Sequence, residues 1–201
     1  MTITEQARRA QLIAATIELI AEHGYAGCSL QRIADAAGIT KAAVIYHFDS
    51  KNAVLRAAYE TVIESLTTHV ETSIAAASSA AGAVDAYVTS LIRHMADHPS
   101  HVRVIVEALG AAEAIGIEDT PHSAARWRPL AALIDAAVAA GEYHSEVDSR
   151  TLAIILSGAI DAVVAETLTD PTFDLTAAGT ALLTTLHRTA DRSGSDGGSI
   201  P

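Results

Sequence analysis

The 201-residue sequence has little of what marks secreted or membrane proteins. Its single cysteine, Cys28, excludes an intramolecular disulfide bond and fits a reducing cytoplasm, where we expect the protein to work. We expect Cys28 to be a small buried residue, with a redox-sensing thiol as the alternative. The polar start, MTITEQARRAQ, does not resemble a signal peptide. The most apolar later stretch, 151–164, contains Asp161 and is shorter than the roughly 20 residues that a membrane span needs.

Signals for β-structure are also scarce. Aromatic residues make up only 4% of the chain, no alternating β-branched runs stand out, and no Asn-Gly or Asp-Gly pair joins two strand-like segments. Hydrophobic residues make up 50% of the chain and alanine dominates them, which favours helix. We therefore expect an all-α fold of about nine helices, arranged in one or two domains with a substantial core.

Residues 29–51, SLQRIADAAGITKAAVIYHFDSK, have the pattern of two short helices joined by a tight turn. From Leu30, apolar residues recur at i, i+3, i+4 and i+7, which is one face of a helix. Ser29 is a suitable N-cap for this helix, and Gly38 has the backbone freedom to end it. Thr40 is a suitable N-cap for a second helix that runs through Phe48. This pattern predicts a helix-turn-helix, whose second helix enters the DNA major groove.

The sequence around this stretch resembles the N-terminal domain of TetR-family transcriptional regulators. The resemblance covers residues 8–58 and rests on the order of a helix, HGY at 23–25, SLxxIAxxAGITK at 29–41 and YHFxSK at 46–51. It implies a three-helix DNA-binding domain at 1–50 and a helical effector-binding and dimerisation domain at 51–190. The segment 141–148, GEYHSEVD, resembles a connector that many such C-terminal domains carry. The Ser/Gly-rich tail at 191–201 is predicted to be disordered.

Capping residues and breaks predict where the helices begin and end. We expect residues 1–4 to fray and Gly24 to end the first helix. Pro129 should bend the seventh helix or split off its first turn. The fourth helix is long enough to leave the DNA-binding domain, so a shift at its far end would move the helix-turn-helix. The expected ranges are 6–23, 30–37, 41–48, 51–77, 83–97, 100–115, 122–140, 149–168 and 175–190.

The uneven distribution of charge is compatible with DNA binding despite a net charge of −11. Residues 1–56 carry six basic and five acidic side chains, a net charge of +1, so the remaining residues carry −12. The acidic excess would disfavour the approach of DNA to the wrong side of the molecule. Because the charge of the N-terminal segment is small, we expect modest non-specific affinity and a shallow salt dependence for each monomer.

The resemblance also implies which residues contact DNA. Residues at helix N-termini would meet phosphate, and the start of the second short helix would enter the groove, where a lysine can reach guanine and a methyl group can meet thymine. Simpler roles stay open for three of these residues: Tyr46 could cover the helix, His47 could complement the helix dipole, and Lys41 could be solvated. Ala43 and Ile45 replace polar residues common in the family. The expected contacts are Ser29, Thr40, Lys41, Ala42, Ala43, Tyr46, His47 and Lys51.

The C-terminal domain is predicted to sense a small molecule and to form a homodimer. The last two helices are rich in small residues that permit close packing, and in the family they form the dimer interface; the alternative is that they only close the monomer core. A mainly apolar pocket would suit a small hydrophobic effector, although for each residue taken alone a place in the core is the simpler interpretation. The expected lining residues are Tyr59, Ile63, Leu66, Tyr87, Leu91, Met95, Ile105, Leu109, Trp127 and Ile134.

A histidine-rich stretch leaves a second interpretation open. His94 and His98 are four residues apart on one helical face, with His101 nearby, and this spacing suits zinc or nickel. The simpler explanation is that histidines near a helix C-terminus complement its dipole. We therefore expect no metal or cofactor, and a regulator that binds operator DNA rather than an enzyme or a membrane protein. The alternatives are a metal-responsive regulator, an all-α metal-dependent enzyme using these histidines, or an architectural DNA-binding protein without an effector.

Overall fold

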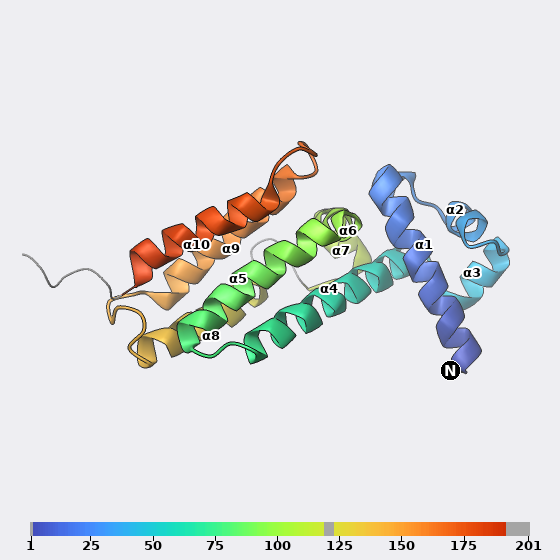
Figure 1. Ribbon diagram of the computed structural model, residues 1–201. Coiled ribbons are helices and arrows are strands. Elements are labelled where there is room, and N and C mark those ends of the chain that lie inside the picture. The colour runs from blue at the N-terminus through green and yellow to red at the C-terminus, as the bar shows by residue number, and fades with distance from the viewer. Residues whose placement is uncertain (1, 119–122, 192–201) are drawn as a thin grey trace, which may run out of the picture. The chain divides into compact units, whose positions relative to one another are not determined.

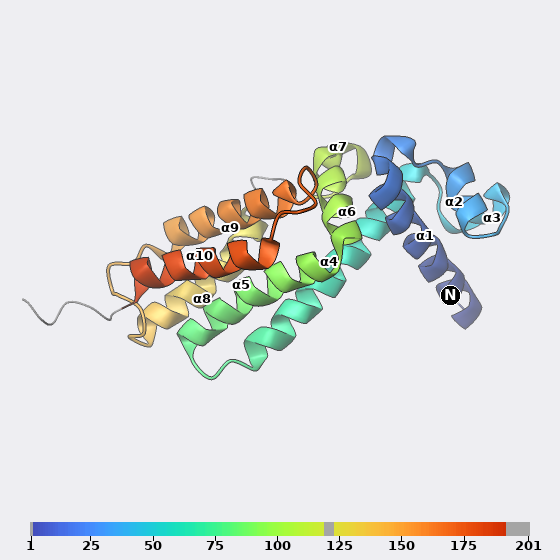
Figure 2. The same ribbon diagram turned by 45° about the horizontal axis from the view of Figure 1, so that its top comes forward.

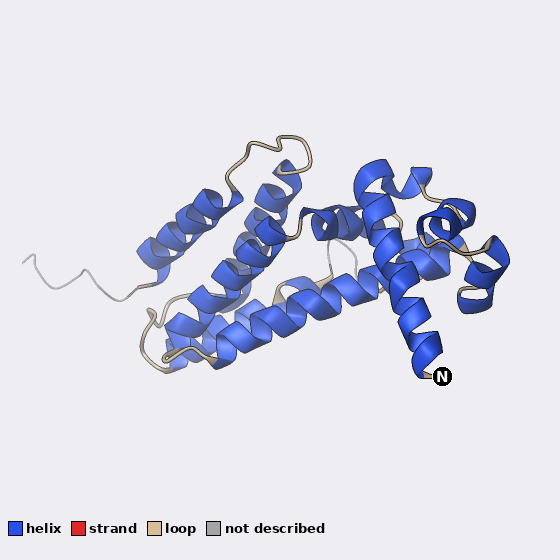
Figure 3. Cartoon of the chain, turned by 45° about the vertical axis from the view of Figure 1, so that its right-hand side comes forward, coloured by secondary structure: helices blue, strands red, loops and turns tan. Residues whose placement is uncertain are grey.

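The computed structural model describes residues 2–118 and 123–191, so the predicted tail at 191–201 lies outside the described residues except for residue 191. Within these ranges the chain is helical and contains no strand, which confirms the all-α prediction (Figure 3). No helix in the described ranges is both long enough and apolar enough to cross a membrane. The elements are α1 (Ile3–Gly27), α2 (Leu30–Ala36), α3 (Lys41–His47), α4 (Lys51–Ala75), α5 (Ala80–Asp97), α6 (Pro99–Gly110), α7 (Ala112–Ile115), η1 (Ala124–Arg126), α8 (Arg128–Ala139), α9 (Ser149–Glu166) and α10 (Leu175–Ala190) (Figure 1).

The chain divides into two compact units. The first comprises Met1–Thr67 and Asp97–Pro121, and the second comprises Thr68–Ala96 and His122–Pro201. Helix α4 begins in the first unit and continues past Thr67, so one helix belongs to both units. That continuity agrees with the long fourth helix expected from the sequence.

Helix α1 is longer at both ends than the sequence predicts. It begins at Ile3 because Thr2 and Glu5 form a capping box, so residues 3 and 4 are helical rather than frayed. Gly24 interrupts the regular helix, as the sequence predicts, but helical structure resumes after it. That residue has φ +66° and ψ 173°, which kinks the helix, and a further turn continues to Gly27. Glycine tolerates this conformation because it lacks a Cβ.

Helix α1 packs on α6 inside the first unit. The Tyr25 backbone N–H, freed by the kink, donates to the Glu107 carboxylate at 3.2 Å. The Arg103 guanidinium donates to the Ala21 carbonyl at 3.4 Å. The polar backbone groups at the end of α1 are therefore satisfied by side chains of α6, which anchors the helix that precedes the helix-turn-helix.

Other helix boundaries also differ from the predictions. The expected helix at 100–115 is two helices, α6 and α7, because Ala111 has non-helical φ −113° and ψ 16° next to Gly110, a poor helix former. Ten α-helices are described instead of nine. Helix α5 begins at Ala80 rather than residue 83. The sequence prediction that Pro129 splits the following helix is confirmed, since the 3-10 turn η1 precedes α8.

The second unit has a core built from α5, α8, α9 and α10. These four helices run beside one another in two views of the chain (Figures 1 and 2). The approach of α10 to α5 is close, since a Cβ placed on Gly179 would lie 2.9 Å from the Ile92 side chain. A bulkier residue at 179 would therefore force these two helices apart. Buried core residues include Val84, Leu130, Ala131, Ile134, Ala137, Tyr143, Ala153, Leu156, Leu186 and Ala190.

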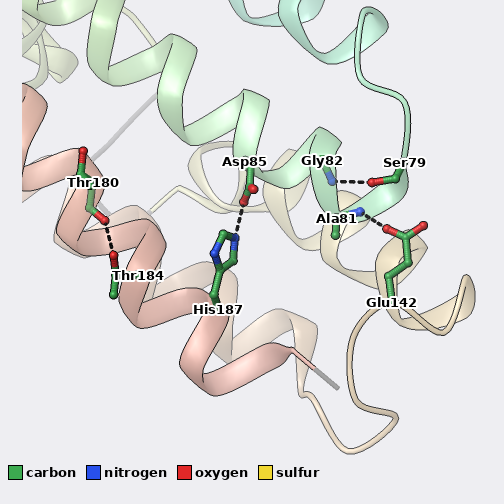
Figure 4. Close-up of polar contacts among 8 residues, drawn as sticks. All are labelled: Ser79, Ala81, Gly82, Asp85, Glu142, Thr180, Thr184 and His187. Atoms are coloured by element: carbon green, nitrogen blue, oxygen red, sulfur yellow. Dashed lines mark hydrogen bonds and ion pairs between the residues drawn. The ribbon is translucent and has the colours of Figure 1, made fainter. Parts of the chain in front are cut away.

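Two polar contacts tie the ends of these helices together (Figure 4). Glu142, in the connector after α8, accepts the Ala81 backbone N–H at 2.7 Å and the Ala80 N–H at 3.3 Å, which caps the N-terminus of α5. His187 of α10 lies 2.8 Å from the Asp85 carboxylate of α5. The connector that resembles a family segment thus has a structural role, because it satisfies free N–H groups of α5.

Candidate nucleic-acid interface

The turn between α2 and α3 is built as the sequence predicts. The Ser29 and Thr40 hydroxyls each accept a backbone N–H of the following first turn at 3.2 Å, so both helices are N-capped. Between them, Gly38 has φ +66°, a conformation that favours glycine. The Ile39 N–H then bonds to the Ala34 carbonyl at 3.0 Å. The direction of α3 relative to α2 is therefore set by three sequence features that were recognisable in advance.

Helix α3 buries one face in the first unit and exposes the other. Val44 is fully buried and Phe48, the C-cap residue, is 2% exposed. On the opposite face Tyr46 is 74% exposed and Ile45 is 46% exposed. This helix therefore presents an outward surface suited to a groove. Of the other predicted contacts on it, the exposed residues are Lys41 and Ala42, and the half-buried residues are Ala43 and His47.

Two side chains one turn apart on α1 contact the C-terminal end of α3. The Arg9 guanidinium donates to the His47 carbonyl at 2.7 Å and lies 4.0 Å from the centroid of the Phe48 ring. The Tyr46 hydroxyl donates to Glu5 Oε1 at 3.2 Å. Sequence reasoning missed Glu5 and Arg9, because they lie about 40 positions from their partners and no local periodicity reveals such pairs.

The last predicted contact, Lys51, begins α4 next to the end of α3. Its ammonium lies 3.8 Å from the centroid of the Tyr25 ring, and the Tyr25 hydroxyl bonds to the Asn52 side chain. Burial raises the pKa of Tyr25, so this phenol stays protonated at neutral pH. The Ser50 hydroxyl caps α4 by accepting the Ala53 N–H at 3.1 Å. Lys51 is therefore held at a capped helix N-terminus, where anions bind favourably.

The ten predicted effector contacts are divided between the two units. The first unit holds Tyr59, Ile63, Leu66, Ile105 and Leu109, and the second holds Tyr87, Leu91, Met95, Trp127 and Ile134. Tyr59, Met95, Ile105 and Ile134 are buried. The remaining six are half-buried, and Tyr87 and Trp127 pack at the margin of the second core. Burial raises the pKa of Tyr87, with the nearby Arg126 charge opposing this effect.

The predicted histidine candidates are also divided between the units. His94 is 4% exposed and its ring centroid lies 5.4 Å from that of His69 in the second unit. In the first unit, His98 and His101 stack with centroids 4.8 Å apart. Burial, and then the nearby His98, lower the pKa of His101, so it is predominantly neutral at pH 7. Metal binding by these residues stays an alternative to the prediction that the protein holds no metal.

A capped two-helix turn with an exposed second helix is the geometry of a helix-turn-helix, a class of DNA-binding motif. A sequence model of the family described as "Bacterial regulatory proteins, tetR family" matches residues 12–58, which include the whole of this turn. This part of the chain is therefore similar to the DNA-binding region of that family of transcriptional regulators.

A curated relative agrees with this assignment. The chain is 36% identical over 63 residues to the HTH-type transcriptional regulator BetI of Ectopseudomonas mendocina (strain ymp). The match covers 31% of this chain and 32% of BetI, so it spans about a third of the relative's length. The similarity to BetI is therefore limited to part of each protein.

Solved structures share the fold over most of the chain. The fatty acid degradation regulator FadR from Bacillus halodurans is similar with a TM-score of 0.77 and 23% identity, covering 89% of this chain and 94% of FadR. A putative transcriptional regulator from Pseudomonas aeruginosa PAO1 has a TM-score of 0.73 and 25% identity, covering 91% of each chain. SmeT, the repressor of the Stenotrophomonas maltophilia efflux pump SmeDEF, has a TM-score of 0.72 and 20% identity, covering 96% of this chain and 95% of SmeT.

Proposed function

We propose that the protein is a ligand-responsive repressor that binds a palindromic operator as a homodimer and is released by a small, largely apolar effector. The observation that carries this proposal is the outward face of α3, with Tyr46 74% exposed beside the exposed Lys41. A helix that buries Val44 and exposes the opposite face matches the geometry of recognition helices. The description of SmeT as a repressor supports the same mode of action.

The DNA contacts follow from the positions of the capped helix ends. Ser29, Thr40 and Lys51 all lie at helix N-termini, where hydroxyl, N–H and ammonium groups suit phosphate. Along α3, Lys41 and the methyl groups of Ala42 and Ala43 enter the groove, and Tyr46 and His47 contact the backbone or a base edge. Because several of these contacts are to phosphate, they orient the protein, and the residues at the start of α3 select the sequence.

Dimerisation through α9 and α10 is supported by their exposed faces. On α9 one exposed stripe, with residues at 155, 158, 162 and 165, is made of small and apolar residues, and Ile155 on it is 60% exposed. On α10 the exposed side is made largely of alanine and threonine. Small residues permit the close helix approach that a four-helix interface needs. The residues of this proposed interface are Ile155, Gly158, Ala162, Ala165, Ala177, Ala181 and Thr184.

Effector binding would act on DNA binding through α4. Of the predicted contacts in the second unit, Tyr87, Leu91 and Trp127 are half-buried and so retain surface for a ligand. Helix α4 continues from the first unit into the second. A ligand that favours one position of the C-terminal end of α4 would therefore favour one spacing of the two recognition helices. Linkage then requires operator DNA to weaken effector binding by the same factor.

A gel shift on the DNA upstream of the protein's own gene tests the proposal. Wild-type protein should bind a discrete site, and Tyr46→Ala and Lys51→Ala should each weaken binding. Arg93→Ala, which removes an exposed cation of the second unit, is the matched control and should bind as wild type does. Equal binding by all four proteins would refute the assignment of the DNA contacts to α3 and the start of α4.

A further inference from the structure

The exposed Tyr46 hydroxyl already has an anionic partner in the free protein. It donates to Glu5 Oε1 at 3.2 Å, while Glu5 Oε2 accepts the Thr2 backbone N–H at 2.6 Å. Glu5 is the acidic residue of the α1 capping box, so its carboxylate is held in place by the helix start rather than by Tyr46. A negative charge is therefore fixed at the outward face of the recognition helix.

The ionisation of Glu5 follows from these contacts. The hydrogen bond from the Thr2 backbone N–H, and then that from the Tyr46 hydroxyl, lower the pKa of Glu5, so it carries a full negative charge at neutral pH. A carboxylate oxygen and a phosphodiester oxygen are the same kind of acceptor for a phenol: both are anionic and both make short, charge-assisted bonds. A phenol has one proton to donate, so it serves one of these acceptors at a time.

We propose that Glu5 mimics a DNA phosphate. In the free protein its carboxylate accepts the hydrogen bond of the Tyr46 hydroxyl, and a phosphate oxygen replaces the carboxylate as acceptor when DNA binds. This inference rests on the proposed function, because it requires that Tyr46 lie against the DNA backbone. Glu5 is then an autoinhibitory residue: it holds Tyr46 in its free-state position and repels the phosphate that replaces it. DNA affinity is lower than the cationic side chains of the interface alone would give.

The Glu5→Gln variant isolates the charge. Glutamine also serves at the third position of a capping box, so its single amide oxygen can keep accepting the Thr2 N–H and α1 is preserved. Its NH2 group then faces the Tyr46 hydroxyl and cannot accept the hydroxyl proton, which leaves that proton available for phosphate. Removing the charge should tighten binding to an operator duplex about two- to fivefold at low salt, the range that corresponds to an exposed charge contact. The gain should shrink at high salt because exposed charges are screened.

Glu18→Gln is the matched control. Glu18 is an exposed acidic residue of the same helix, 13 positions away, which corresponds to about 20 Å along the helix axis. It removes the same unit of charge without touching Tyr46, so it should change affinity less than Glu5→Gln does. Circular dichroism melting of each variant should give the wild-type transition, which separates the charge effect from a loss of folding.

A double-mutant cycle with Tyr46→Phe tests the exchange itself. Tyr46→Phe should weaken DNA binding, and in that background the gain from Glu5→Gln should fall, because no hydroxyl remains to be released. Unchanged or weaker binding by Glu5→Gln, or an equal gain in the Tyr46→Phe background, would overturn the inference. If Tyr46→Phe and Tyr46→Ala both bind as wild type does, the proposed contact of Tyr46 with DNA has failed instead.

Discussion

Arg9 of α1 donates to the carbonyl of His47, the last residue of the recognition helix, at 2.7 Å, and its guanidinium lies 4.0 Å from the centroid of the Phe48 ring. The carbonyls at a helix C-terminus lack intrahelical partners, so a cationic donor there both completes a hydrogen bond and complements the dipole. One side chain thus fixes the end of a helix of only seven residues. Such a short helix depends on tertiary contacts for its stability.

We predict that Arg9→Ala lowers the free energy of unfolding by about 1–2 kcal/mol, because a half-buried hydrogen bond and a cation–π contact are lost together. Operator affinity should fall as well, because α3 is no longer held at its C-terminal end. Urea unfolding and fluorescence anisotropy measure the two effects. Arg8→Ala is the control, since Arg8 is exposed and bonds to Gln11 on its own helix. Equal effects at both positions would contradict a specific role for Arg9.

Gly24→Ala should destabilise the protein by about 2–3 kcal/mol. The residue has φ +66°, and a Cβ there would lie 2.8 Å from Glu107 Oε1. If the Glu107 carboxylate moves to make room, the Tyr25 N–H loses its partner. Gly110→Ala is the control, because its φ is ordinary and a Cβ would meet nothing within 4 Å; it should be neutral or stabilising by up to about 1 kcal/mol. Thermal unfolding monitored by circular dichroism distinguishes the two.

Ala162→Glu should convert a dimer into monomers without unfolding the chain. Ala162 is exposed on α9, so a carboxylate there is tolerated by the monomer but would be buried without a partner in the proposed interface. Ala136→Glu on the exposed side of α8 is the control and should remain dimeric. Sedimentation equilibrium gives the molar mass of each. A dimeric Ala162→Glu protein would exclude this face of α9 from the interface.

Stability should fall at acid pH in part through Glu142. Hydrogen bonds from the Ala81 N–H, and then from the Ala80 N–H, lower the pKa of this carboxyl below its ordinary value of 4.5. Because the folded-state pKa is the lower one, its contribution is complete above about pH 4.5 and is lost as the pH falls through the folded value. Urea midpoints measured from pH 7 to pH 3 should therefore fall less steeply for Glu142→Gln than for wild type. Parallel curves would show that this cap contributes nothing in solution.

Local signals in the sequence were sufficient for the helix-turn-helix. Ser29 and Thr40 cap helices that begin at the next residue, and Gly38 forms the turn between them. Their roles could therefore be predicted from neighbouring residues in the sequence. The exposed side of α3 followed from the periodicity that buries Val44. The same reasoning placed Pro129 correctly at the start of a separate helix.

The parts that sequence reasoning missed depend on residues far apart in the chain. Arg9 reaches a carbonyl 38 residues away, and Tyr46 reaches a carboxylate 41 residues away. Glu107 made the continuation of α1 beyond Gly24 possible, because it accepts an N–H that the kink leaves free. No local rule contains these partners, so the sequence predicts the interruption at Gly24 but not the further turn that continues to Gly27.

In the proposed dimer, two outward recognition helices contact one face of the DNA. Changing the spacing between the two half-sites of the operator tests this arrangement most directly. Inserting five base pairs at the centre of the bound palindrome turns one half-site about half a helical turn away from the other. Affinity measured by fluorescence anisotropy should then fall towards the level of non-specific DNA, and an insertion of ten base pairs should be tolerated better than one of five. Unchanged affinity after the five-base-pair insertion would contradict paired binding by two α3 helices.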